Sequence, residues 1–510
     1  MRPVPRQPAW RRRGACCLGG MRLQMTCKIL FGIAVWVLPV AGTYGGPHIV
    51  ALDNISTNSV TRFDRAGAVI DERLRITSVE DNAVIPKNHL YPIVEWESPE
   101  DYSTAFLVEL RSSKRTLEIL LRKGLRWQPE GEQFAGFLND REVVVTVYRL
   151  SHGKTSKSRS VRLVVSERAV TDRIVFRAVP LYFIPGEPVA VKLLFLHQRQ
   201  AELLLHVQGA CVGCHAYADG TAIFNSAKKK TRMAVTVHRE DRVYRLNRHL
   251  FKEFSFVALS PDGKHAAVVK QTTGKLVTRK DSGDPFDLVY KTGDIYIYSF
   301  ATDTVAALPG ASDPQFVEDM PWFSPDGTKI LFSRYKTVEK KKNKVYVVES
   351  MDFYEVPFNG GKGGTPVPIP GASANGMYQY FARYTPNGKW ISFCRANASK
   401  GAFVRKDSDI HLLSLNDHAV TKLSLNKDTV MDSWHDWSSD SHWLIFSSRR
   451  DKNQLTALYM SYVDDNGKDH PPIKIADEPE RKTNTPLFAP ATLNLETAGN
   501  ITDYVYGCFP

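Results

Sequence analysis

The chain has 510 residues, of which 43% are hydrophobic and 24% charged, and its formal net charge is +13. A hydrophobic fraction of this size predicts a folded protein with a large core and excludes a disordered chain. Much of the basic excess lies at the N-terminus, so the charge does not indicate a nucleic-acid partner.

The N-terminal segment, residues 1–45, is predicted to be an export signal. Residues 1–28 contain seven Arg or Lys and no acidic residue, and Ile29–Ala41 is an apolar run of thirteen residues. This arrangement is typical of a signal peptide, and thirteen residues are too few to span a bilayer about 30 Å thick. We therefore expect cleavage near Ala41 or Gly42 and a periplasmic or otherwise exported protein, with an uncleaved membrane anchor as the alternative.

The next segment, residues 46–168, is predicted to be a small β-sandwich of the immunoglobulin or fibronectin type III kind. Phe106–Leu110 and Val143–Tyr148 are β-forming runs, and Trp96 and Trp127 are expected to anchor the core. We expect this domain to serve in docking or spacing rather than in chemistry.

A C-x-x-C-H motif follows at residues 211–215, with Cys211, Cys214 and His215 as its fixed positions. This is the attachment signature of a c-type haem. Two thiols at this spacing can each form a thioether to one vinyl group of the same porphyrin, and the adjacent imidazole can bind the iron. We expect one covalent haem c, held by Cys211 and Cys214, with His215 as an axial ligand.

Other interpretations of the motif are weaker. A thioredoxin-type pair requires a helix that starts at the first cysteine, whereas a turn and a strand are predicted here. A structural zinc site requires a second pair of ligands, and the sequence offers no second C-x-x-C. A disulfide between Cys211 and Cys214 remains the alternative if haem is never attached.

Short repeats containing a Ser-Pro-Asp-Gly-like turn run through the second half of the chain. Four copies lie at Leu259–Lys264, Phe323–Thr328, Tyr384–Lys389 and Trp437–His442, and a weaker fifth copy starts inside the motif at His215–Gly220. Pro fixes φ at the first turn position, and Gly supplies the left-handed residue that starts the return strand. Each copy therefore predicts a β-hairpin.

A third alternating strand follows four of these hairpins, at Asp294–Tyr298, Asp352–Val356, Asp409–Leu413 and Ala457–Ser461. The turn positions recur every 43 to 64 residues, which suits four-stranded propeller blades with loops of variable length. Strands from about 172 to 205, together with the tail after Pro486, can complete a further blade. The sequence predicts an all-β chain whose residues 169–510 form a β-propeller, with six blades favoured over seven.

These repeats resemble the PD40, or WD40-like, repeats of TolB-type β-propellers over roughly residues 172–490. A C-x-x-C-H motif that runs into the first blade resembles the haem-bearing TolB-like proteins, and the haem propeller domain of the hydrazine synthase alpha subunit is similar. In that enzyme a tyrosine four residues beyond the motif's histidine serves the iron. Here Asp219 has the matching position and Tyr217 is the nearest tyrosine, so the catalytic arrangement does not transfer.

The sixth iron ligand has several candidates. Tyr217 lies just after the motif, His435 comes from a distant repeat, and other histidines and methionines share no distinguishing spacing. For His435 the alternative is a structural histidine bonded to a neighbouring blade.

Taken together, these patterns predict an exported monohaem c-type cytochrome that serves electron transfer or forms part of a redox enzyme. One alternative is a haem enzyme that acts on a small nitrogen or oxygen species. Another is a TolB-like interaction propeller whose haem is non-functional or sensory. We expect a redox partner protein, possibly acidic and attracted by Lys228–Lys230 and Lys340–Lys342, and a chain that is soluble after signal cleavage or peripherally associated with a membrane.

Overall fold

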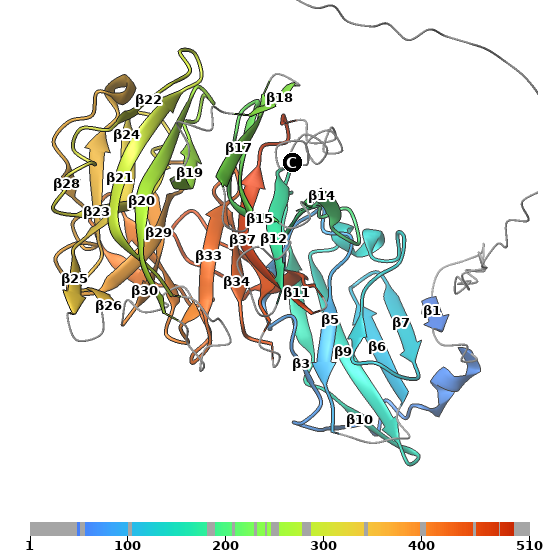
Figure 1. Ribbon diagram of the computed structural model, residues 1–510. Helices are drawn as coiled ribbons and strands as arrows, with labels where there is room; N and C mark the ends of the chain where they lie inside the picture. Colours follow the sequence, from blue (N-terminus) through green and yellow to red (C-terminus); the bar gives the residue numbers. More distant parts are fainter. Residues whose placement is uncertain are drawn as a thin grey trace, which may run out of the picture. The chain divides into compact units, whose positions relative to one another are not determined.

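The computed structural model describes thirteen stretches of the chain and consists mainly of β-strands (Figure 1). The described residues are 48–51, 57–99, 105–180, 189–206, 210–228, 232–239, 242–245, 254–277, 287–340, 345–397, 404–451, 455–478 and 480–493. Short 3-10 helices lie at Thr57–Arg62 (η1), Ala135–Asn139 (η2) and Asn359–Gly361 (η3). The expected signal peptide lies outside the described residues.

The N-terminal domain contains two sheets that share one core. Its strands are β1 (His48–Ala51), β2 (Val69–Ile70), β3 (Arg75–Ile76), β4 (Ala83–Ile85), β5 (Val94–Glu97), β6 (Ala105–Arg111), β7 (Thr116–Leu121), β8 (Arg126–Trp127), β9 (Glu142–Ser151), β10 (Lys154–Lys157) and β11 (Val161–Val165). The larger sheet has the order β1-β7-β6-β9-β10-β2, with β11 paired to β9 and β4, and the smaller has the order β3-β5-β8.

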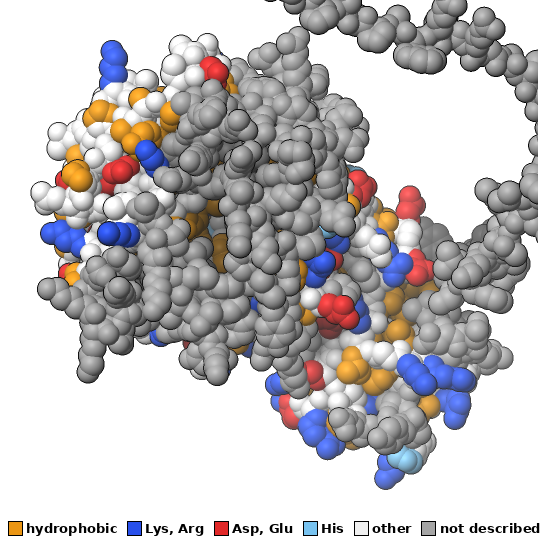
Figure 2. All heavy atoms as spheres, in the orientation of Figure 1, with side chains coloured by type: hydrophobic (Ala, Val, Ile, Leu, Met, Phe, Trp, Pro, Cys, Tyr) orange, Lys and Arg blue, Asp and Glu red, His pale blue; other side chains and the backbone are white. Residues whose placement is uncertain are grey.

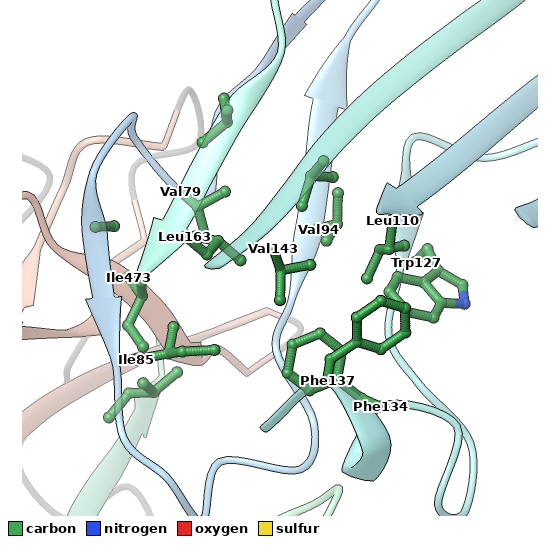
Figure 3. Close-up of a cluster of buried hydrophobic side chains, with 14 of the residues drawn as sticks. Val79, Ile85, Val94, Leu110, Trp127, Phe134, Phe137, Val143, Leu163 and Ile473 are labelled. Carbon is green, nitrogen blue, oxygen red and sulfur yellow. The ribbon is translucent and has the colours of Figure 1, made fainter. Parts of the chain in front are cut away.

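Aromatic side chains join the two sheets, as the sequence predicts. Trp96 of the small sheet packs edge-on against Phe106 of the large sheet with ring centroids 5.5 Å apart, and both tryptophans are buried. Figure 3 shows Trp127, Phe134 and Phe137 within this core. The core is continuous with the propeller, because Ile473 from a later strand belongs to the same cluster.

The described residues after β11 form six four-stranded groups, the blades of a propeller, and a single parallel pair, Gly293 with Val317, joins the third and fourth groups into one sheet. From the inner strand outwards, blade 1 contains β37 (Arg481–Ala489), β12 (Arg173–Pro180), β13 (Ala190–Leu194) and β14 (Glu202–His206), and blade 2 contains β15 (Ala210–Ala218), β16 (Thr221–Lys228), β17 (Arg232–Arg239) and β18 (Arg242–Arg245). Blade 3 contains β19 (Phe254–Leu259), β20 (His265–Val277), β21 (Asp287–Ser299) and β22 (Thr304–Ala307), and blade 4 contains β23 (Val317–Phe323), β24 (Lys329–Tyr335), β27 (Asp352–Pro357) and β28 (Val367–Pro368). Blade 5 contains β29 (Tyr378–Tyr384), β30 (Trp390–Ala396), β31 (Asp409–Ser414) and β32 (Val420–Lys422), and blade 6 contains β33 (Asp432–Trp437), β34 (Trp443–Ser448), β35 (Ala457–Tyr462) and β36 (Ile473–Ala476). A separate hairpin, β25 (Thr337–Lys340) and β26 (Val345–Val348), is inserted in blade 4.

The inner strands form a closed ring. Each contacts the inner strand of the next blade, and β37 contacts both β33 of blade 6 and β15 of blade 2. Strand β37 also pairs antiparallel with β12, so the C-terminal strand completes the blade that the first propeller strands begin. The prediction of six blades, with the tail completing one of them, is confirmed.

The repeated turns have the expected geometry. In blade 3 the Ser260 hydroxyl donates to Asp262 Oδ1 over 2.6 Å, and Gly263 has a φ of +64°. The same side-chain bond recurs between Ser324 and Asp326, Thr385 and Asn387, and Ser438 and Asp440. These local bonds explain why the turn is readable from sequence, since each copy contains its own donor, acceptor and left-handed residue.

Blade 2 has a shorter turn than the other repeats. Its first two strands meet at the pair Ala218 and Thr221, which leaves only Asp219 and Gly220 in the turn, and Gly220 has a φ of +62°. In blade 3 the corresponding bond, from the Ser260 amide to the His265 carbonyl, spans a longer loop. The weak fifth copy is therefore a true hairpin with a tighter turn.

A charged cluster fixes the N-terminal domain to blade 6. The ammonium group of Lys474, only 3% exposed, lies 2.8 Å from Glu95 and 2.9 Å from both Asp451 and Asp477. Arg126 adds bonds to Glu95 and Asp477, and the Lys474 amide donates to the Ser78 carbonyl over 2.9 Å. Three carboxylates thus depend on two cations at this junction.

We predict that the substitution Lys474→Met destabilises the protein by about 3 kcal/mol, because it leaves three partly buried carboxylates facing one another without their buried cation. Urea unfolding followed by circular dichroism measures the change. Lys422→Met is the matched control, since Lys422 also bonds two carboxylates but is 45% exposed, and its loss should cost less than about 1 kcal/mol. Equal effects of the two substitutions would contradict a structural role for the cluster.

Candidate functional site

The inner strands share an irregularity that shapes the centre of the propeller. Each has a β-bulge, and five of the six bulges contain a non-glycine residue with positive φ: Thr485, Phe256, Met320, Phe381 and Trp434, with φ between +37° and +55°. Such a backbone costs about 1–3 kcal/mol per residue and persists only where its surroundings impose it. A bulge changes the direction in which its side chains point. The bulge residues of the inner strands therefore form one layer around the centre of the propeller.

The C-x-x-C-H motif lies at this layer, in the inner strand of blade 2. The register of β15 against β16 jumps between Val212 and His215, so Gly213 and Cys214 form the bulge there. Cys214 is partly buried. The side chain of Cys211 lies outside the described part of the chain, although its backbone pairs with Ala227.

The bulge residues bring aromatic rings together. Phe381 lies 6.3 Å from both Phe256 and Trp434, measured between ring centroids, and Phe256 lies 6.5 Å from Tyr290. The charge of Cys214 contributes to raising the pKa of Tyr290, although burial is the larger cause. Cys214 therefore lies near an aromatic cluster built from blades 3, 5 and 6.

His215 is buried between blades 2 and 1. It is 3% exposed, and neither ring nitrogen has a hydrogen bond of ordinary geometry among the described residues, although the backbone of Thr485 lies near enough to influence the ring. Burial, aided by the charge of Arg177 on β12, lowers the pKa of His215 to about 3, and the backbone of Thr485 on β37 opposes this only in part. The imidazole is therefore neutral at physiological pH, which is the form that binds a metal.

Tyr217 lies beside His215 on the same face of β15, with ring centroids 5.4 Å apart. Its hydroxyl is buried and has no hydrogen-bond partner in the described part of the chain. Burial raises the pKa of Tyr217 well above its usual value, so the hydroxyl stays protonated. It can donate a hydrogen bond but is not poised to bind a metal as a phenolate.

These residues fit the haem that the motif predicts. Leaving a buried polar group unpaired costs about 1–3 kcal/mol, and here three such atoms, two on His215 and one on Tyr217, belong to neighbouring rings on the strand that carries Cys214. An imidazole nitrogen bound to iron would no longer be unsatisfied, and the adjacent thiol is the group that forms the thioether. Within the described residues no three His, Cys, Asp or Glu side chains group as a metal site, a condition that haem attachment does not require.

His435 occupies the same position in blade 6 as His215 in blade 2, since they pair with the equivalent residues Phe446 and Phe224. Its Nδ1 atom lies 3.4 Å from the sulfur of Cys394 in blade 5, the expected bond to a neighbouring blade. The groups around His215 come instead from blade 1. The structure therefore places Tyr217, and not His435, beside the motif's histidine.

Sequence reasoning missed Arg383. This residue of β29 lies two positions beyond the bulge residue Phe381 and stacks on Trp322 of blade 4. The only sequence signal is its place just before the repeated turn, where the other blades carry residues of unrelated chemistry, so no pattern singles it out.

Comparisons with known proteins give the fold and nothing finer. No known sequence family matches the chain, and no curated protein matches it. Among solved structures, the periplasmic gluconolactonase of Pseudomonas aeruginosa shares 13% identity over 58% of this chain and 81% of its own, with a TM-score of 0.35. An oligogalacturonate lyase in complex with manganese shares 10% identity over 60% of this chain and 74% of its own, with a TM-score of 0.36.

The β-propeller domain of the Trilobed protease from Pyrococcus furiosus is a third similar structure, with 12% identity over 49% of this chain and 68% of its own and a TM-score of 0.28. At such identities and scores these likenesses carry no argument about binding or catalysis. No described helix is long and apolar enough to cross a membrane.

We predict that burial of His435 makes stability depend on pH. Burial lowers the pKa of His435 to about 3, so its contribution to stability is complete above the ordinary histidine pKa near 6.5 and is lost as the pH falls toward 3. The difference in unfolding free energy between the wild type and His435→Asn should fall by up to about 1.4 kcal/mol per pH unit between about pH 6 and pH 4. Urea titrations across this range measure it.

His418→Asn is the control for this experiment, because His418 is exposed. Its replacement should change the unfolding free energy at pH 7 by less than about 0.5 kcal/mol, as expected for an exposed side chain. Parallel pH profiles for the wild type and His435→Asn would contradict the burial of a neutral His435.

Proposed function

We propose that this chain is an exported c-type cytochrome in which Cys211 and Cys214 attach one haem and His215 binds its iron. The observation that carries the proposal is the state of His215, a buried neutral imidazole that directly follows a partly buried motif cysteine and whose nitrogens have no hydrogen bond of ordinary geometry among the described residues. Bound haem would supply one-electron transfer. The propeller then serves as a rigid holder, because β15 is enclosed by its neighbours on both sides.

The chain's own residues would do three things at this site. The inner strand places Cys214 and His215 next to each other in sequence. Thr485 and Arg177 lie near His215 on its blade 1 side, and Tyr217 offers a protonated hydroxyl. The aromatic cluster that includes Tyr290 and Phe381 would provide an apolar surface on the other side. An apolar environment destabilises the more highly charged oxidation state of a haem. The apolar side chains around the motif would therefore help to set the reduction potential.

A basic run begins beside the motif and supports an acidic redox partner. Lys228 ends β16 directly opposite Ala210, one residue before Cys211, and starts the run Lys228–Lys230. Lys340 similarly ends β25 and starts the second run. On the face shown in Figure 2 the described basic and acidic side chains are interspersed, so steering would come from these runs rather than from a uniform field.

Export belongs to the same proposal. Covalent attachment of haem is completed outside the cytoplasmic membrane in bacteria, and the predicted signal peptide would deliver the chain there. The likeness of the motif and repeats to haem-bearing TolB-like propellers agrees with this location, and the protein would be soluble or peripherally attached to the membrane after cleavage.

We predict one covalent haem per chain when the protein is produced with a c-type maturation system, and none in the double variant Cys211→Ser, Cys214→Ser. A haem-stained denaturing gel and a pyridine haemochrome spectrum measure attachment. Cys394→Ser is the matched control, since Cys394 is a buried cysteine of blade 5 outside the motif and should leave attachment unchanged. Absence of haem from the wild type would leave a TolB-like binding propeller in place of a cytochrome.

We further predict that carbon monoxide leaves the spectrum of the reduced protein unchanged, because a haem that only transfers electrons would leave its iron closed to small ligands. Absorption spectra with and without the gas measure this. A spectral shift would identify an open iron site and favour the alternative, a haem enzyme acting on a small nitrogen or oxygen species. Tyr217→Phe extends the test, since loss of its unpartnered hydroxyl would weaken any small ligand that it bonds.

A further inference from the structure

Arg383 is held at the centre of the propeller without a carboxylate partner. Its guanidinium carbon lies 3.8 Å from the ring centroid of Trp322. Its Nη1 atom donates to the Ala382 carbonyl over 3.0 Å, whereas its buried Nε atom has no hydrogen-bond partner in the described structure. Among the described residues no carboxylate oxygen is recorded within 4.0 Å of this guanidinium.

Other arginines of the propeller bond a carboxylate or an amide, although the Nε atom of Arg334 is also without a partner among the described residues. Arg334 lies 2.9 Å from Glu318, Arg450 lies 2.9 Å from Asp432, and Arg395 donates to Gln379 over 2.7 Å. Burial lowers the pKa of Arg383 to about 10, and the charge of Asp436 opposes this. The guanidinium therefore keeps its charge, and a desolvated cation with a free edge is stabilised by an anion.

The groups near Arg383 come from both blades that flank blade 5 and from blade 2. Trp322 belongs to blade 4, Asp436 to blade 6 and Cys214 to blade 2, and the charges of the last two both influence its pKa. Trp322 covers one face of the planar guanidinium, which fixes the direction of its donor edge. A pre-oriented donor edge matches the two oxygens of a carboxylate.

We propose that Arg383 is a carboxylate-binding residue at the centre of the ring, close to Cys214. Two groups have this carboxylate chemistry. One is a propionate of the haem attached at the motif, and the other is a free carboxylate that enters the ring. The first source rests on the proposed function, and the second does not.

The test compares Arg383→Gln with Arg395→Gln, an arginine on the next strand that also lies over an aromatic ring, Phe393, at 5.2 Å. In the haem-loaded protein the midpoint reduction potential of the haem is measured from about pH 5 to pH 8. If the carboxylate is a propionate, Arg383→Gln shifts the pH at which the midpoint changes and Arg395→Gln does not, because only the first removes the cation that favours the ionised acid.

Calorimetric titration with sodium acetate tests the second source. A free-carboxylate site binds acetate saturably in the wild type, and Arg383→Gln weakens binding at least about tenfold while Arg395→Gln does not. Circular dichroism checks folding, and if Arg383→Gln does not fold, Arg383→Lys retains the charge without the planar fork and should show a partial effect.

The outcomes separate the two proposals. The haem-stained gel reports haem attachment by itself, so a colourless protein that binds acetate through Arg383 would refute the cytochrome and retain this site. An unaltered midpoint profile together with no acetate binding would overturn the carboxylate site whether or not haem is attached.

Discussion

Closure of the ring by β37 is the constraint on which the rest of the propeller depends. This strand provides the inner edge of blade 1 through its pairing with β12 and contacts the inner strands of blades 6 and 2. Its Thr485 lies against His215, and its Phe488 amide donates to Asp436 over 2.8 Å. The surroundings of the motif's histidine are therefore built by strands nearly 300 residues apart in sequence, and they exist only once the ring is closed.

Most of the fold could be predicted because its determinants are local. Each Ser-Pro-Asp-Gly turn carries its own hydrogen bonds, as between Ser260 and Asp262, and its left-handed glycine, so the hairpins follow from short stretches of sequence. Alternating strands supplied the remaining members of each blade. Trp96 and Trp127 were recognisable as core residues because large aromatic side chains beside short β-runs are rarely left in solvent.

The candidate site was predictable only in its chemistry. The motif names Cys211, Cys214 and His215, but no local signal reveals that Phe256 or Trp434 adopts positive φ, because crowding at the ring imposes those bulges rather than any turn residue. Tyr217 and His435 could not be distinguished from sequence either, because the neighbours of each in the fold come from different blades. Arg383 gains meaning only from Trp322 and Asp436, which other blades supply.

The position of the motif in an innermost strand has a consequence for how the protein matures. Thioether formation requires an enzyme to handle the motif as an accessible peptide, yet β15 in the folded chain is flanked by β37 and β19. If haem is attached as proposed, its attachment at Cys211 and Cys214 must precede the pairing of β37 with β12. A chain that crosses the membrane with its N-terminus first would expose the motif before β37 follows, so the order of export would provide the interval for attachment, and the last strand would then close the ring.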